Sequence, residues 1–175
     1  MSINDLWQEI EPLLTPAIAA ALRPPASIDS LHAWVDVAGA LPEPLVALYS
    51  QHEGTYHAGG SKGFCFIGSW YPLPVDDAIQ QYQRAKGLTD LYGQTALIPF
   101  AVGVDGSLLA VASEATQAVD IIYTDGPGGE CFPSLETLMR RTVTGLQGQD
   151  SEYRPELSNN HLIWFNRKYE AGDSA

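Results

Sequence analysis

The N-terminal part of the chain spaces its apolar residues as amphipathic helices do. Over residues 4–22 they recur every three or four positions: Leu6, Ile10, Leu13, Leu14, Ala17, Ile18, Ala21 and Leu22. This spacing predicts a helix that begins with a cap at Asn4 or Asp5. Because proline lacks an amide hydrogen and clashes with the preceding turn, Pro12 and Pro16 must kink this helix or split it in two.

Two further helices are predicted before residue 55. The first is capped by Ser27 or Asp29 and ends at Gly39. The second has Pro42 in its first turn, where the missing amide hydrogen costs nothing. We expect Gly54 to end this helix in the left-handed conformation that glycine adopts easily.

The middle of the chain is predicted to hold one short strand and one longer helix. FCFIG at 64–68 is a short strand-like run, and a helix is expected over residues 75–87. That helix carries Asp76 and Asp77 in its first turn and basic residues in its last, which the helix dipole favours.

From residue 96 the pattern changes to short apolar runs rich in valine and isoleucine. The runs at 96–103, 107–113 and 118–124 are separated by turn sequences such as GVDG at 103–106. They predict consecutive strands joined by hairpin turns. DGPGG at 125–129 is expected to be a loop.

The chain then returns to helix, which settles the predicted fold class. Ser134 caps a helix that runs to residue 146, and a polar linker (148–156) precedes a last short helix. The last helix is predicted from the spacing of Leu162, Phe165 and Tyr169. Helices, a meander of strands and helices again predict an α+β fold, with a small, mostly antiparallel central sheet wrapped by helices.

A length of 175 residues favours one structural domain with additions at its ends. We expect an N-terminal helical extension over residues 1–26 and the α+β domain over residues 27–147. The tail, residues 148–175, is expected to pack on the domain or to trail from it.

The net charge of the chain limits the kinds of molecule that it can bind. The chain has 21 acidic and 9 basic residues and a net charge of -12. Nucleic acids and anionic membranes would be repelled, because binding them requires lysine and arginine. A basic protein would be attracted, and long-range charge mainly speeds that encounter. The plainer alternative is that the acidity only keeps the protein soluble.

The ends and the cysteines indicate a cytoplasmic protein. MSINDLWQEIEPLL at 1–14 lacks the basic region and the apolar core of a signal peptide, and no apolar run is long enough to span a bilayer. Export by a route that needs no signal peptide is the alternative. Cys65 and Cys131 lie in apolar surroundings and are expected to be buried, reduced thiols.

One stretch, YSQHEGTYHAGG at 49–60, resembles a zinc-hydrolase motif. That motif, H-E-x-x-H, puts two histidines four residues apart on one helical face with glutamate as the base. Here the histidines are one residue too far apart, and Gly54 lies between them. We therefore interpret His52 as closing an apolar stripe and His57 as a loop residue. A hydrolase that uses His52, Glu53 or His57 is the less favoured alternative.

Other catalytic motifs are also missing from the sequence. It has neither the G-x-S-x-G element of serine hydrolases nor the G-x-x-x-x-G-K-[ST] phosphate loop. We therefore predict no catalytic residue, no metal ligand and no cofactor, and expect a protein that is not an enzyme.

Four segments, in order, carry a family resemblance. They are LPEPLVALYSQHEG (41–54), SWYPLPVDDAIQQYQ (69–83), LIPFAVGVDGSLLAVAS (97–113) and FPSLETLMRRTV (132–143). They resemble the helix-then-glycine element, the strand-to-helix step, the paired strands and the closing helix of the SUKH superfamily, the Smi/Knr-type domains. The resemblance covers about residues 31–146. It departs where the family often ends the second strand with an acidic residue and this chain has Ser113 before Glu114.

The resemblance implies a mixed α+β domain that needs no cofactor. It also implies a function, because bacterial members of this family are mostly immunity proteins that bind and neutralise a cognate toxin. We therefore expect a cytoplasmic immunity protein whose partner is a toxin, and the net charge favours a basic one. The alternative is a regulatory or scaffolding module that binds a cellular protein.

Six residues are the predicted contacts with that partner: Glu53, Tyr56, Asp105, Glu114, Asp125 and Glu130. The five acidic residues lie at predicted helix ends and strand turns, where side chains are exposed. Tyr56 is included because tyrosine and tryptophan are common at protein interfaces. Trp70 is expected in the core. Taken one at a time, each acidic residue is better interpreted as a solvated surface charge.

Overall fold

The computed structural model describes residues 1–56, 63–91, 97–112, 118–158 and 160–170. Its helices are α1 (Ile3–Ile10), the 3-10 turn η1 (Glu11–Leu13), α2 (Pro16–Ala19), α3 (Ile28–Ala38), α4 (Glu43–Tyr49), α5 (Val75–Leu91), α6 (Leu135–Leu146) and α7 (Arg167–Glu170). Its strands are β1 (Tyr71–Pro72), β2 (Leu97–Val102), β3 (Leu108–Ala112), β4 (Val119–Tyr123), β5 (Gly126–Phe132), β6 (Tyr153–Leu157) and β7 (Leu162–Asn166).

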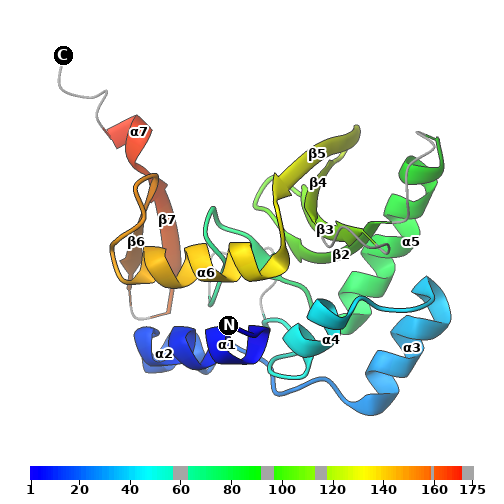
Figure 1. Cartoon of the computed structure of the whole chain (residues 1–175), viewed down its shortest axis with the longest axis horizontal. Coiled ribbons are helices and arrows are strands. Elements are labelled where there is room, and N and C mark those ends of the chain that lie inside the picture. Colours follow the sequence, from blue (N-terminus) through cyan, green and yellow to red (C-terminus); the bar gives the residue numbers. More distant parts are fainter. Residues whose placement is uncertain (57–62, 92–96, 113–117, 159, 171–175) are drawn as a thin grey trace.

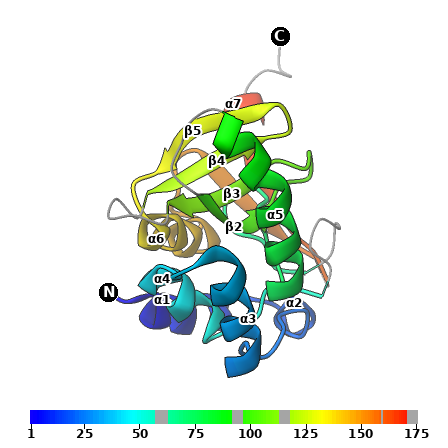
Figure 2. The same ribbon diagram turned by 90° about the vertical axis from the view of Figure 1, so that its right-hand side faces the viewer.

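Strands β1 to β5 form one antiparallel sheet in chain order, and β6 and β7 form a separate hairpin. Helix α5 packs against β2, and α3 packs on α5 (Figure 2). Helix α6 lies over α1 and meets the sheet at β5 (Figure 1). This arrangement confirms the predicted α+β fold with an antiparallel central sheet and helices around it. None of the helices in the described part of the chain is both long and apolar enough to cross a membrane.

The two prolines split the first helical segment, as predicted. Helix α1 ends at Ile10, and α2 begins at Pro16. The cap is Ser2, one turn earlier than expected: its hydroxyl accepts from the Asp5 amide at 3.2 Å, while the Asp5 carboxylate accepts from the Ser2 amide at 2.8 Å. The apolar face of α1 is buried and joins the same core as the sheet, so residues 1–26 help to build the domain.

Helix α4 ends at Tyr49, five residues before Gly54, so the prediction that Gly54 ends it is wrong. Gly54 does adopt a left-handed conformation, with φ +73°, but for another reason. A Cβ atom there would lie 2.5 Å from the backbone of Leu73 and Pro74. Glycine is therefore required because two backbone segments pass against each other.

The run at 64–68 is buried but is not a regular strand. Phe64, Cys65 and Phe66 have no exposed surface, and only isolated bridges, such as Phe66 with Trp70, connect this region to other segments. Trp70 itself is half-buried and packs against the core, close to the prediction. The predicted helix at 75–87 is present as α5 and continues to Leu91.

The prediction of a loop at DGPGG is wrong, because Gly126 to Gly129 belong to strand β5. The pairing with β4 shifts twice, which makes Gly128 and Cys131 the extra residues of two bulges. A Cβ at Gly128 would lie 2.4 Å from the side chains of Ile121 and Tyr123. Gly128 thus makes room for the side chains of the neighbouring strand. Cys131 is exposed there, contrary to the prediction.

The tail is also different from the prediction, since residues 153–166 form the β6–β7 hairpin and only α7 is helical. Leu162 and Trp164 are buried while Ile163 is exposed, which is the two-residue period of a strand. Trp164 packs where Gly145 leaves space: a Cβ at Gly145 would lie 2.6 Å from the Trp164 ring.

Replacing Gly54 by alanine is expected to reduce the free energy of unfolding by more than about 2 kcal/mol, because both the backbone clash and the positive φ penalise a side chain. Gly148, just after α6, is the matched control: its φ is +75° but a Cβ there meets nothing within 4 Å. Gly148→Ala should cost only the conformational penalty of about 1 kcal/mol. Urea denaturation measures both, and equal losses would contradict the close-approach explanation.

Candidate partner-binding site

Two of the predicted contact residues lie at the same end of the sheet. Asp105 is in the turn between β2 and β3, and Asp125 is in the turn between β4 and β5. Alternate turns of an antiparallel meander share one end, and both side chains are exposed. The β4–β5 hairpin also carries Glu130, exposed on β5, the edge strand of the sheet. This hairpin projects from the helical part of the molecule (Figure 1).

The β2–β3 turn holds Asp105 in a fixed, charged state. The Ser107 amide donates to Asp105 Oδ1 at 3.0 Å, and the Ser107 hydroxyl donates to the same oxygen. These two bonds lower the pKa of Asp105 below its ordinary value. The turn is closed by the Gly103 amide, which donates to the Ser107 carbonyl at 2.8 Å, as predicted for GVDG.

A further carboxylate, Asp120 on β4, lies directly opposite Glu130 on β5. Burial raises the pKa of Asp120, and the charge of Glu130 raises it further. Like charges directly opposite each other on paired strands destabilise a sheet. Sequence reasoning missed Asp120, because the partner strand was expected to be a loop and only the strand register brings the two side chains together.

We call Asp120, Asp125 and Glu130 the acidic hairpin. Residues 119–132 contain no lysine or arginine, so no base within the hairpin balances these three charges. Asp105 adds a fourth carboxylate at the adjacent turn.

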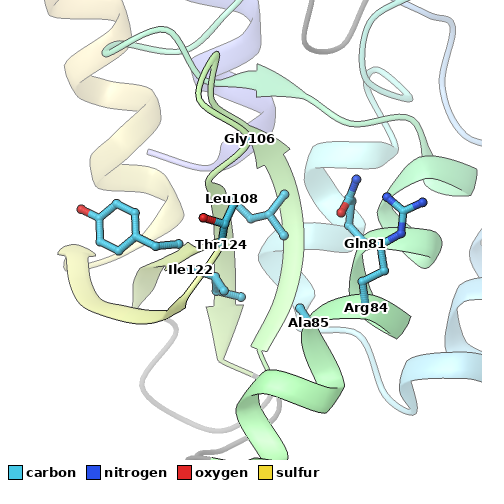
Figure 3. A pocket seen from close by; sticks show the side chains of 8 residues that line it. Gln81, Arg84, Ala85, Gly106, Leu108, Ile122 and Thr124 are labelled. Atoms are coloured by element: carbon cyan, nitrogen blue, oxygen red, sulfur yellow. The ribbon is translucent and has the colours of Figure 1, made fainter.

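A cavity of about 240 Å³ lies beside this end of the sheet, between α5 and the strands. Leu108 and Ile122 line it from the sheet, and Gln81 and Arg84 line it from α5 (Figure 3). Among the described residues Arg84 makes no hydrogen bond or ion pair. It is the one basic group among the described residues that line this cavity.

Glu53 and Tyr56 lie in a different part of the molecule. The Glu53 carboxylate is 3.7 Å from the guanidinium of Arg23, and only 12% of its side chain is exposed. The same guanidinium lies 5.9 Å from the centre of the Tyr56 ring. The structure therefore does not group these two residues with the acidic hairpin. Glu114 lies outside the described residues.

The side chain of His52 is held by contacts within the fold. Its Nδ1 lies 3.0 Å from the carbonyl oxygen of Arg23, and its Nε2 lies 3.0 Å from the Glu11 carboxylate. Its ring packs edge-on against Trp7 at 4.9 Å. These contacts connect the turn after α4 to the N-terminal helices. His57 lies outside the described residues, and among those described no three His, Cys, Asp or Glu side chains are grouped to hold a metal ion.

A second cavity, of about 330 Å³, separates the sheet from the β6–β7 hairpin. Arg141 lines it and pairs with Asp150 at 3.1 Å and with Glu152 at 2.9 Å. Burial works to raise the pKa of Asp150, but hydrogen bonds from two backbone amides and from Arg141 outweigh burial and leave it lowered. Cys131, although exposed on the strand, also lines the cavity, and partial burial of its thiol there raises the pKa. The ion pairs of Arg141 with Asp150 and Glu152 hold the β6–β7 hairpin against α6.

No protein-family model matches the sequence, and a search of curated proteins finds no significant relative. We therefore infer function from the chain's own residues and from the sequence resemblance that they carry.

Replacing Asp120 by asparagine is expected to raise the free energy of unfolding at neutral pH by about 0.5 kcal/mol, because it removes the cost of partly burying a charge and the repulsion from Glu130. A raised native pKa means that the charged form of Asp120 destabilises the fold. The penalty is absent below the ordinary pKa of 3.8, grows as the pH rises through the native pKa, and is complete above it.

Denaturation across the pH range measures this effect. The gain of Asp120→Asn should be present at neutral pH and disappear in acid. Asp29→Asn removes one exposed charge that has no acidic residue within four positions along the chain, and serves as the control. A gain for Asp120→Asn that persists at low pH, or an equal gain for Asp29→Asn, would contradict a penalty on the charged form of Asp120.

Proposed function

We propose that this protein is an immunity protein that binds a cognate bacterial toxin of basic character and neutralises it by direct contact. The observation that carries the proposal is the acidic hairpin. It presents Asp120, Asp125 and Glu130 on an edge hairpin whose own residues, 119–132, include no lysine or arginine. Two of these carboxylates face each other at a cost to the fold.

A cationic partner explains why such an arrangement is useful. A lysine or arginine placed between Asp120 and Glu130 converts their repulsion into two charge-assisted contacts, so relief of native-state repulsion adds to the binding free energy. The net charge of -12 also steers a basic protein toward this surface and raises the association rate.

Neutralisation follows from the same charges. A toxin that attacks nucleic acid needs a cationic surface to hold phosphates. An acidic hairpin seated on that surface occupies the positions that the phosphates would take. The inhibitor then competes with the toxin's substrate by charge mimicry and by steric exclusion.

The family resemblance supports the same reading. The segments that carry it form α4 with the turn to Gly54, β1 leading into α5, the β2–β3 hairpin, and α6. These are the element types and the order expected for a Smi/Knr-type domain, whose bacterial members are mostly immunity proteins.

Affinity capture from cells that encode the protein tests the proposal. The wild-type chain should capture one stoichiometric basic protein that carries a toxin domain, identified by mass spectrometry. Asp120→Asn/Asp125→Asn/Glu130→Gln should reduce the affinity for that protein at least about tenfold, since each desolvated charge contact contributes on the order of 1 kcal/mol or more.

The control is Glu9→Gln/Asp77→Asn/Glu156→Gln, which removes the same number of exposed charges elsewhere. It should retain most of the affinity and lower only the association rate. Capture of a housekeeping protein in place of a toxin would support the regulatory alternative. Equal losses in the two variants would show that net charge, not the acidic hairpin, determines binding.

A further inference from the structure

Helix α3 has a buried face and an unusually apolar exposed face. Trp34 has no exposed surface and anchors the helix to the core. On the other side Ile28 is 72% exposed and Val35 is 41% exposed. Ile28, Leu31, His32 and Val35 follow the i, i+3, i+4, i+7 spacing, so they form one continuous stripe along the helix.

Helix α4 completes this apolar surface. Val46 is 37% exposed, and with Leu41 it faces the α3 stripe across a groove of about 240 Å³. Except for His32, every residue that lines the groove is aliphatic. We call this surface, lined by Ile28, Leu31, His32, Val35, Leu41 and Val46, the α3–α4 groove. Scattered exposed aliphatic residues are ordinary, but a contiguous set marks an interaction surface.

Acidic residues border the groove. Asp29 and Asp36 each follow a stripe residue by one position, which places them about 100° around the helix, along one edge of the stripe. Glu43 is exposed in the first turn of α4. Residues 24–61 contain no lysine or arginine, so no base from this part of the chain offsets the border.

The charge of the border decides between possible occupants. A second copy of the chain would bring the same carboxylates face to face around the groove, and like charges in juxtaposition oppose association. An apolar helix with basic flanks satisfies both features, because its aliphatic stripe fills the groove while lysine or arginine meets the border. Helix-in-groove recognition uses the i, i+3, i+4, i+7 anchors that α3 itself displays.

We propose that the α3–α4 groove is the docking site for a basic amphipathic helix of the partner protein. This inference rests on the proposed function in that it takes the partner to be a basic protein. It adds a second, apolar contact that is separate in sequence and chemistry from the acidic hairpin. The groove supplies buried apolar area, which sets the dissociation rate, and the charged surfaces mainly set the association rate.

A synthetic peptide tests the groove without the natural partner. The probe is a fluorescent helix of about 18 residues, with leucine at helical spacing on one face and lysine on the other. Fluorescence anisotropy measures its affinity for the full-length protein. A peptide of the same composition in scrambled order keeps the charge and loses the apolar face, and it should bind at least about tenfold more weakly.

Variants then locate the bound helix. Ile28→Ser/Val35→Ser should weaken binding of the leucine–lysine peptide at least about tenfold. Asp29→Asn/Asp36→Asn should also weaken this binding and reduce its salt dependence.

Two control variants leave the groove intact. Val104→Ser removes an equally exposed aliphatic side chain, 74% exposed in the β2–β3 turn, and should not change the affinity for the peptide. Glu9→Gln/Glu156→Gln removes two exposed charges outside the groove; it is the charge-matched control and should retain the affinity. Because the groove side chains are exposed, all variants should stay folded, with losses within about 1 kcal/mol in urea denaturation.

Three results would overturn the inference. They are equal binding of the scrambled peptide, full binding by Ile28→Ser/Val35→Ser, and a concentration-dependent dimer of the wild type that this double variant abolishes. Failure here is distinguishable from failure of the proposed function. If the groove variant still binds the captured toxin with full affinity, only the groove inference fails. If no toxin is captured at all, the proposed function fails, whatever the peptide does.

Discussion

The fold depends on one buried segment, residues 63–67, which has no regular secondary structure. The rings of Phe64 and Phe66 pack against Trp7 of α1 at 5.2 and 6.2 Å, and Phe66 also meets Phe100 of the sheet at 6.3 Å. A buried backbone without a ladder needs other hydrogen-bond partners. The Thr142 hydroxyl accepts from the Ile67 amide at 3.1 Å. Helix α1, the sheet and α6 therefore converge on this segment.

The same segment determines what is left exposed. The Trp164 indole donates to the Cys65 carbonyl at 3.2 Å, and the Cys65 thiol donates to the Leu162 carbonyl at 3.1 Å, so the C-terminal hairpin covers one side of the segment. Trp34 of α3 packs edge-on against Tyr49 of α4 at 4.8 Å. This contact joins the buried sides of the two helices, while aliphatic side chains on their other sides line the α3–α4 groove.

Sequence reasoning predicted those parts in which local chemistry decides the structure. Helix α3 with its Ser27 cap, the split at the prolines, and strands β2 to β4 follow directly from periodicity, capping and turn residues. Strand β5 was missed, because Gly128 serves the side chains of a neighbouring strand and that need is visible only in three dimensions. Asp120 was missed for the same reason, since a cross-strand pair depends on register. The role of Gly54 was misassigned because its close neighbours are nearly twenty residues away in the chain.

The proposed function rests on two different surfaces, the acidic hairpin and the α3–α4 groove. Growth of strains that lack this gene, with and without the gene of the captured partner, shows whether the protein neutralises a toxin. Loss of this gene alone should stop growth when the toxin is made, and deleting the toxin gene should restore growth completely. A growth defect that persists without the toxin gene would contradict the proposed function and indicate a role in the cell's own regulation.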